Sequence, residues 1–259
     1  MQLFPNDNIK YDSKKLSNIK NITESTLRLI AYSRLHWADD LLTACISKIT
    51  SYQELLSLKN AQMEAQSEEE AKQYANRLNI ALDYITSEIK ESIIFNSEVQ
   101  LFQLFRLISP ESHSIHPNKY RNELVQVGKY LCPEPGQVPN LVSELFYQMN
   151  QINNPIIKAI YFHHELIRIH PFNDGNGRTT RMAKNWMLMY ELYSPIFISG
   201  NTEKKKYVNT LESSFIELDC NPGVWNNHLN KFFNQELTRL LKNTISVYEF
   251  VKESGKKRS

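Results

Sequence analysis

Hydrophobic residues recur at three- and four-residue intervals along most of the chain, the spacing that gathers side chains on one face of an α-helix. Helices are predicted at residues 21–48, 64–90, 96–109, 138–150, 155–170, 177–193, 203–218 and 224–251, with a short element of unassigned type at 51–58. The helix at 155–170 is apolar all round, so we expect it to be central and buried. The basic tail KESGKKRS is expected to be frayed.

One stretch, KYRNELVQVGKYLCPEP at residues 119–135, departs from this helical pattern. Its apolar positions between Leu124 and Tyr130 surround Gly128, and prolines follow them. This arrangement is typical of a short hairpin or flap. The sequence therefore predicts an all-α protein with one short β-hairpin before its central helix.

Composition narrows the class of protein without deciding its function. The formal net charge is only +2, which gives no reason to expect direct binding of nucleic acid. No apolar run approaches the roughly 18 residues of a membrane span, and the N-terminus lacks a signal-type apolar stretch. The three cysteines, Cys45, Cys132 and Cys220, are widely spaced, as expected for reduced thiols in a cytosol.

The candidate chemistry lies in the loop IHPFNDGNGRTTR, which holds two of only seven glycines in the chain. Gly175, Asn176 and Gly177 open a helix, and successive backbone N–H groups at such a turn form an anion-binding nest. Arg178 and Arg181 are three residues apart in that helix, so they share a face beside the nest. Guanidinium groups bind phosphate in a bidentate fork. The loop therefore predicts a phosphate site.

Two further residues extend the site toward catalysis. Asp174 is a hard oxygen ligand of the kind that holds Mg²⁺ together with substrate phosphates, and His170 is suited to act as a general base. The set fits transfer of part of a nucleotide to a hydroxyl. Taken one at a time, the residues have simpler readings: Asn176 as a helix cap, His170 as a structural histidine, and Asp174 as a partner of the helix N-terminus.

Residues 170–181, HPFNDGNGRTTR, resemble the signature of the Fic family, HxFx(D/E)GNGRxxR, with every defining position filled. The resemblance extends over about residues 95–235, including the hairpin, the central helix and the helix after the signature. It implies a mainly helical Fic fold with a catalytic core at 96–240, an N-terminal helical region at 1–95, and a C-terminal helix end with a basic tail at 241–259.

The resemblance also implies a role for each position. His170 would deprotonate the target hydroxyl, Asp174 would hold Mg²⁺, and Phe172 would anchor the loop in the core. Gly175, Asn176 and Gly177 would form the anion hole. Arg178 would steady the leaving phosphates, and Arg181 would contact the γ-phosphate of ATP. Tyr207 falls where the family often has an aromatic residue near the adenine, although a core tyrosine fits equally well. The flap residues Val125, Gln126, Val127 and Gly128 would bind a target segment by strand addition.

The implied activity is protein adenylylation, in which AMP moves from ATP to a Ser, Thr or Tyr hydroxyl of a target protein and pyrophosphate is released. Gly175, where phosphocholine-transferring and kinase-like relatives have Ala, favours this nucleotidyl-transferring branch. Transfer from UTP, GTP, CTP or another phosphate-linked donor stays open, as does a regulatory or binding protein with low activity.

Many Fic proteins restrain themselves with a helix that carries (S/T)xxxE(G/N). In IAYSRLHWADD, Ser33 fits the start of that motif, but Trp37 stands at the glutamate position and Ala38 at the glycine position. The hypothesis is that no intact inhibitor exists within the chain. The protein would then be a toxin restrained by a separate antitoxin, an effector secreted into a host or target cell, or a cytoplasmic enzyme active when made.

Two other stretches match known patterns in part. SSFIE ends in Glu217 and fits SxxxE, but it lies on the helix behind the signature and Leu218 follows it. His163, His164 and Glu165 suggest a metal box, yet their spacing is not HExxH and adjacent residues point about 100° apart on a helix. Packing in the core is the expected role of these histidines.

Overall fold

The computed structural model describes residues 1–34, 41–62, 65–198 and 200–256. Within them the protein is helical except for one small antiparallel sheet, formed by β1 (Gln126–Val127) and β2 (Tyr130–Leu131). This arrangement confirms the predicted fold class. None of the helices in these residues is long and apolar enough to cross a membrane.

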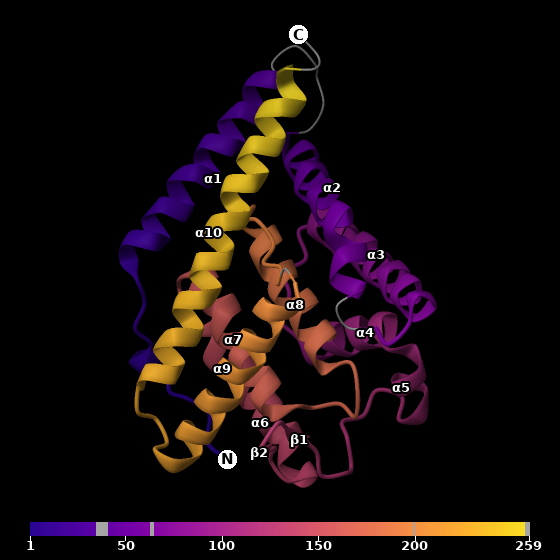
Figure 1. The fold of residues 1–259 in the computed structure, drawn as a ribbon, viewed down its shortest axis with the longest axis vertical. Helices are drawn as coiled ribbons and strands as arrows, with labels where there is room; N and C mark the ends of the chain where they lie inside the picture. Colours follow the sequence, from indigo (N-terminus) through magenta and orange to yellow (C-terminus); the bar gives the residue numbers. More distant parts are fainter. Residues whose placement is uncertain (35–40, 63–64, 199, 257–259) are drawn as a thin grey trace.

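Two helix pairs, one of which includes the C-terminal helix, diverge from the top of the molecule (Figure 1). Helix α1 (Ser13–Arg34) lies along α10 (Asn227–Lys256), whereas α2 (Leu41–Gln62) lies along α3 (Glu68–Lys90). The prediction of one helix at 21–48 was therefore wrong, and the element at 51–58 is the second half of α2. The sequence gives no sign of two separate helices, because the hydrophobic periodicity continues from one to the other and no proline or glycine stands between them.

Capping fixes where α3 and α4 begin. Ser67 accepts the N–H of Glu70 at the start of α3, and Ser97 forms a capping box with Gln100 at the start of α4 (Glu98–Ile108). Of the two adjacent residues that could cap α4, Asn96 and Ser97, the structure uses Ser97. A short helix that the pattern did not predict, α5 (Pro110–Ile115), follows α4.

The central helix α7 (Pro155–Ile169) is surrounded as expected. Asn154 accepts the N–H groups of Ile156 and Ile157, each at 3.1 Å, and every residue from Ile156 to Ile169 except Lys158 is buried. Helices α6 (Val138–Asn150), α8 (Asn176–Tyr190) and α9 (Asn201–Cys220) complete the core around it (Figure 1).

Several helix ends differ from the prediction by a few residues, and two of them have a clear outcome in the structure. Helix α8 ends at Tyr190, three residues early, because the backbone turns at Leu192, which has φ of 61°. Helix α10 runs to Lys256, into the tail that was expected to be frayed. The division of the chain at residues 95 and 240 stays a prediction.

The hairpin lies between α5 and α6. Of the two short 3₁₀ helices, η1 (Asn6–Asn8) precedes α1 and η2 (Pro135–Gln137) lies between the hairpin and α6. Val127 pairs with Tyr130 across a turn in which Gly128 has φ of +61°. Tyr130 is buried and packs on Phe215 of α9, and the N–H of Lys129 donates to Glu212 of α9 at 2.7 Å. Helix α9 therefore supports the hairpin from beneath.

Candidate active site

The signature loop connects the end of α7 to the start of α8 through two left-handed residues. His170 ends α7 with φ of 53° and ψ of 63°, and Gly175 precedes α8 with φ of 78° and ψ of 0°. A non-glycine residue in this region of backbone space is uncommon and marks a site held by its surroundings. The loop therefore changes direction sharply at both ends, between the end of α7 and the start of α8.

Asn176 and Phe172 hold the loop in shape. The Asn176 amide accepts the N–H of Phe172 at 2.9 Å and donates to its carbonyl at 2.6 Å, so the side chain is used within the loop. Phe172 is buried and stacks on Phe105 of α4, with ring centroids 3.8 Å apart and planes 4° apart. This is the core anchor expected for Phe172. Any contribution of Asn176 to an anion hole therefore comes from its backbone N–H.

Gly175 lies against Ser109, the residue between α4 and α5. A β-carbon at Gly175 would lie 2.0 Å from the Ser109 Oγ, and a left-handed residue there is strained in any case. At Gly177 a β-carbon would lie 3.2 Å from the Arg181 guanidinium. Glycine is thus required at residue 175 by the backbone and the core, whereas at residue 177 an added carbon would crowd only the end of the Arg181 side chain one turn ahead.

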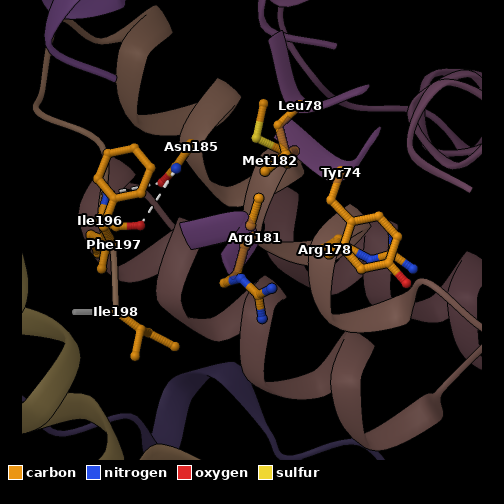
Figure 2. A pocket seen from close by; sticks show the side chains of 10 residues that line it. Tyr74, Leu78, Arg178, Arg181, Met182, Asn185, Ile196, Phe197 and Ile198 are labelled. Atoms are coloured by element: carbon orange, nitrogen blue, oxygen red, sulfur yellow. Dashed lines mark hydrogen bonds between the residues drawn. The ribbon is translucent and has the colours of Figure 1, made fainter. Parts of the chain in front are cut away.

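The two arginines of the signature lie on one side of α8, as the spacing predicted, and have different surroundings (Figure 2). Arg178 is largely buried, pairs with the Asp174 carboxylate at 3.1 Å, and lies over the ring of Tyr74 from α3 at 3.9 Å. Tyr74 was not identified in the sequence. The helical N-terminal region therefore contributes a side chain to the candidate site.

Arg181 points into a cavity of about 40 Å³ between α2, α3, α8 and residues 196–198 (Figure 2). The other walls are mainly apolar and include Leu78, Met182 and Ile198. Asn185 pins one wall by accepting the N–H of Ile196 at 2.9 Å. Because pockets for small ligands are typically about 300–1,000 Å³, this cavity is too small for a nucleotide base.

One ring nitrogen of His170 faces a backbone carbonyl of α7. Its Nδ1 lies 3.3 Å from the carbonyl of Ile167, and burial lowers the pKa of the imidazole to about 4 despite that contact. The ring is therefore neutral near pH 7, and because a carbonyl only accepts hydrogen bonds, Nδ1 carries the proton and Nε2 the lone pair.

Arg121 is a second residue that sequence reasoning missed. Its side chain is buried and donates to the carbonyls of His170 at 2.7 Å, Pro133 at 2.6 Å and Glu123 at 2.6 Å, while its backbone N–H donates to Pro171. It therefore ties the signature loop to both flanks of the hairpin. Its neighbours Asn122 and Glu123 are also polar, so nothing in the sequence sets this arginine apart from an exposed one.

Tyr207 lies apart from the cavity. It is buried on α9, its hydroxyl contacts His163 Nε2 at 2.7 Å, and Arg239 of α10 lies 5.5 Å over its ring. It belongs to a buried charged cluster in which Lys184 and Arg239 each contact Glu236 at 2.6 Å. The residues of the signature lie together around the start of α8. Tyr207, which was expected near the adenine, lies instead in this buried cluster.

The histidine pair on α7 is structural. His164 contacts Glu165 at 2.7 Å through Nδ1 and Ser214 at 2.8 Å through Nε2, and burial lowers the pKa of both His163 and His164. Within the described part of the chain no three His, Cys, Asp or Glu side chains cluster as a metal site.

Asp174 is the candidate magnesium ligand, and its side chain is 72% exposed. Mg²⁺ commonly takes one or two carboxylates and completes its shell with water and substrate phosphates. A single accessible carboxylate beside a phosphate nest fits that requirement, although Arg178 is its partner in this structure.

The inhibitory motif of the family concerns two places in this chain, residues 33–38 and the segment that ends in Glu217. Trp37 and Ala38 lie outside the described residues. Glu217 is on α9, where its carboxylate accepts a hydrogen bond from Asn221 at 2.9 Å, a contact local to the end of that helix. The hypothesis of a missing inhibitor stays a prediction.

The sequence is similar to a known protein family and to curated proteins. Residues 95–188 match the family model described as the Fic/DOC family. The "Protein adenylyltransferase Fic" of Culex quinquefasciatus is 30% identical over 134 residues, which cover 50% of this chain and 27% of that protein. The relative of the same name from Drosophila persimilis is 29% identical, with coverage of 50% and 26%. The chain thus spans about a quarter of the length of the curated relatives it matches.

Solved structures share the fold. A Fic domain containing signaling protein from Bacteroides thetaiotaomicron has a TM-score of 0.69 at 20% identity, covering 91% of this chain and 97% of that one. Fic-1 from C. elegans has a TM-score of 0.60 at 16% identity, covering 93% and 75%. IbpAFic2 covalently tethered to Cdc42 has a TM-score of 0.55 at 17% identity, covering 90% and 72%. The similarity extends over the N-terminal helices as well as the signature.

Proposed function

We propose, for a chain that carries a Fic/DOC family domain at residues 95–188, that it is a protein adenylyltransferase. It would move AMP from ATP to a Ser, Thr or Tyr hydroxyl of a target protein. The observation that carries this proposal is the arrangement at the start of α8, where a neutral histidine, a phosphate nest and two arginines lie within one loop and one helical turn. The names of the curated relatives support the same activity.

The proposed reaction begins with His170. Its Nε2 takes the proton of the target hydroxyl, and the oxygen attacks the α-phosphorus of ATP. The bond between the α-phosphorus and the α,β-bridging oxygen breaks, and pyrophosphate leaves with the electron pair. Backbone N–H groups from Gly175 to Gly177 would stabilise the charge that develops on the α-phosphate oxygens.

The arginines act on the leaving side. Arg178, fixed by Asp174 and Tyr74, would steady the leaving phosphates, and Arg181 would meet the γ-phosphate. When bound, Mg²⁺ would neutralise phosphate charge beside Asp174, which is the residue proposed to hold it. Most of the catalysis would come from positioning and charge stabilisation.

The hairpin is the proposed docking place for the target. Because β1 pairs with β2 in a two-stranded sheet, its other side, along Val125 to Gly128, offers an edge to which an extended segment could add as a strand. The structure of IbpAFic2 tethered to Cdc42 supports a protein partner for this fold. We also propose that the chain lacks an intact inhibitory glutamate, because Trp37 stands at the position that the family motif assigns to it.

Mass spectrometry of the purified protein with Mg²⁺ and ATP tests this proposal, with His170→Ala as the matched control. Self-labelling by one AMP in the wild type alone supports both the transfer and the absence of an inhibitor. Labelling from GTP, UTP or CTP but not ATP would replace the donor. Labelling that needs Glu217→Ala would contradict the missing-inhibitor proposal. Absence of labelling and of nucleotide binding with all four donors would overturn the assignment.

A further inference from the structure

The guanidinium of Arg178 lies between residues from two distant parts of the chain. Asp174, four residues earlier, contacts its edge at 3.1 Å, and the ring of Tyr74 lies 3.9 Å from it. Figure 2 shows Tyr74 reaching from α3 to the rim of the cavity, directly over Arg178. Tyr74 is only partly buried, so the contact is made at the surface of the site.

The tyrosine is itself held in place. Its hydroxyl donates to the Glu70 carboxylate one turn earlier on α3, and the other oxygen of Glu70 accepts the N–H of Gln66 at 2.6 Å. The hydrogen bond from Tyr74, the N–H of Gln66 and the nearby charge of Arg178 keep the pKa of Glu70 low. The carboxylate is therefore ionised, and its negative charge polarises the tyrosine toward the cation.

This geometry suits an arginine that must present its N–H groups to phosphates. A guanidinium is planar, and its donors point outward in that plane. A ring stacked on the face fixes the orientation of the plane and consumes none of those donors. A carboxylate in the place of the ring would instead accept hydrogen bonds from the guanidinium and turn its N–H groups away from an incoming anion.

We propose that Tyr74 is a positioning residue of the active site, a ring held by Glu70 that orients the Arg178 guanidinium for the leaving phosphates of the nucleotide. This inference rests on the proposed function. It assigns the N-terminal helical region a direct part in nucleotide use, because α3 supplies both Tyr74 and Glu70.

Binding of ATP and of AMP to purified variants tests the inference, with calorimetry as the readout. Tyr74→Ala is expected to weaken ATP binding about 3- to 30-fold, the range of one cation–π contact, and to leave AMP binding unchanged, because AMP lacks the leaving phosphates. Tyr74→Phe keeps the ring and is expected to restore most of the ATP affinity. Tyr147→Ala, at an exposed tyrosine of α6, is the matched control.

A double-mutant cycle separates positioning from simple packing. In an Arg178→Ala background, Tyr74→Ala is expected to cause no further loss of ATP affinity, because the side chain it orients is gone. Equal losses of ATP and AMP affinity, additive losses in the cycle, or unchanged ATP affinity in Tyr74→Ala would each overturn the inference while the proposed function stands. A wild type that binds neither nucleotide would overturn the proposed function, and the inference with it.

Discussion

Gly175 lies so close to Ser109 that a β-carbon at position 175 would be 2.0 Å from the serine Oγ and 2.8 Å from its Cβ. The contact joins the start of α8 to the junction of α4 and α5, which places the phosphate nest directly on the core. Substitution at residue 175 therefore has to displace the loop or the junction.

The first prediction follows from this contact. Gly175→Ala is expected to reduce nucleotide transfer at least about 100-fold, because the added carbon clashes and the left-handed backbone costs an alanine about 1–2 kcal/mol. Gly136→Ala is the control, since residue 136 has open space around it and an ordinary φ. Ser109→Gly in the Gly175→Ala background is expected to recover part of the activity, as measured by labelled-nucleotide transfer. Full activity of Gly175→Ala alone would contradict this account.

A second prediction concerns pH. Burial disfavours the charged imidazolium of His170, so its pKa is lowered to about 4 and the neutral base persists to low pH. The rate constant kcat/KM is expected to stay level from about pH 8 to about pH 5 and to fall as the pH drops through about 4. Initial-rate measurements across this range, with circular dichroism to verify folding at each pH, provide the test. A fall centred near 6.5, the ordinary histidine value, would show that the ring is solvated in the working enzyme.

The third prediction addresses the buried charged cluster. Glu236 contacts both Lys184 and Arg239 at 2.6 Å, and all three side chains are buried. Glu236→Gln keeps the shape but removes the carboxylate that pairs with the buried Lys184, while Arg239 keeps its ion pair with Glu203, so the free energy of unfolding is expected to fall by about 3–5 kcal/mol. Urea denaturation measures this change. The control, Glu217→Gln, alters a carboxylate bonded only locally at the end of α9, and a change below about 0.5 kcal/mol is expected. Equal effects of the two substitutions would contradict the role assigned to the cluster.

The sequence predicted those parts of the site that are contiguous in the chain. His170, Asp174 and the residues from Gly175 to Arg181 meet because one loop and two helical turns contain them all. The caps at Asn154 and at the start of α4 were also readable, since capping depends on neighbouring residues.

Contacts between distant segments could not be predicted in this way. Tyr74 reaches Arg178 only because α3 packs beside α8, and nothing around Tyr74 distinguishes it from an ordinary tyrosine on a helix. Arg121 acts through backbone carbonyls, which carry no side-chain signature in the sequence. The position of Tyr207 depends on which face of α9 meets α7, and periodicity does not show this.

The last prediction concerns the hairpin, where Gly128 lies against Glu212. A β-carbon at residue 128 would lie 2.5 Å from the Glu212 Cδ, and the turn has φ of +61°. Gly128→Ala is therefore expected to displace the Glu212 carboxylate and so to break the 2.7 Å hydrogen bond that it accepts from the Lys129 N–H. Hydrogen exchange at Lys129 is expected to quicken about tenfold, while ATP affinity stays within about twofold of the wild type.

Glu212→Ala separates the loss of the hydrogen-bond acceptor from strain in the turn. It removes the acceptor without straining the turn, so the Lys129 amide is expected to exchange faster with Gly128 in place. Glu212→Gln keeps an acceptor oxygen and is expected to behave as the wild type. If Glu212→Ala left the exchange of Lys129 unchanged, the hairpin would be held by the burial of Tyr130 alone. The support that α9 gives to the proposed target-binding edge would then come from packing and not from this carboxylate.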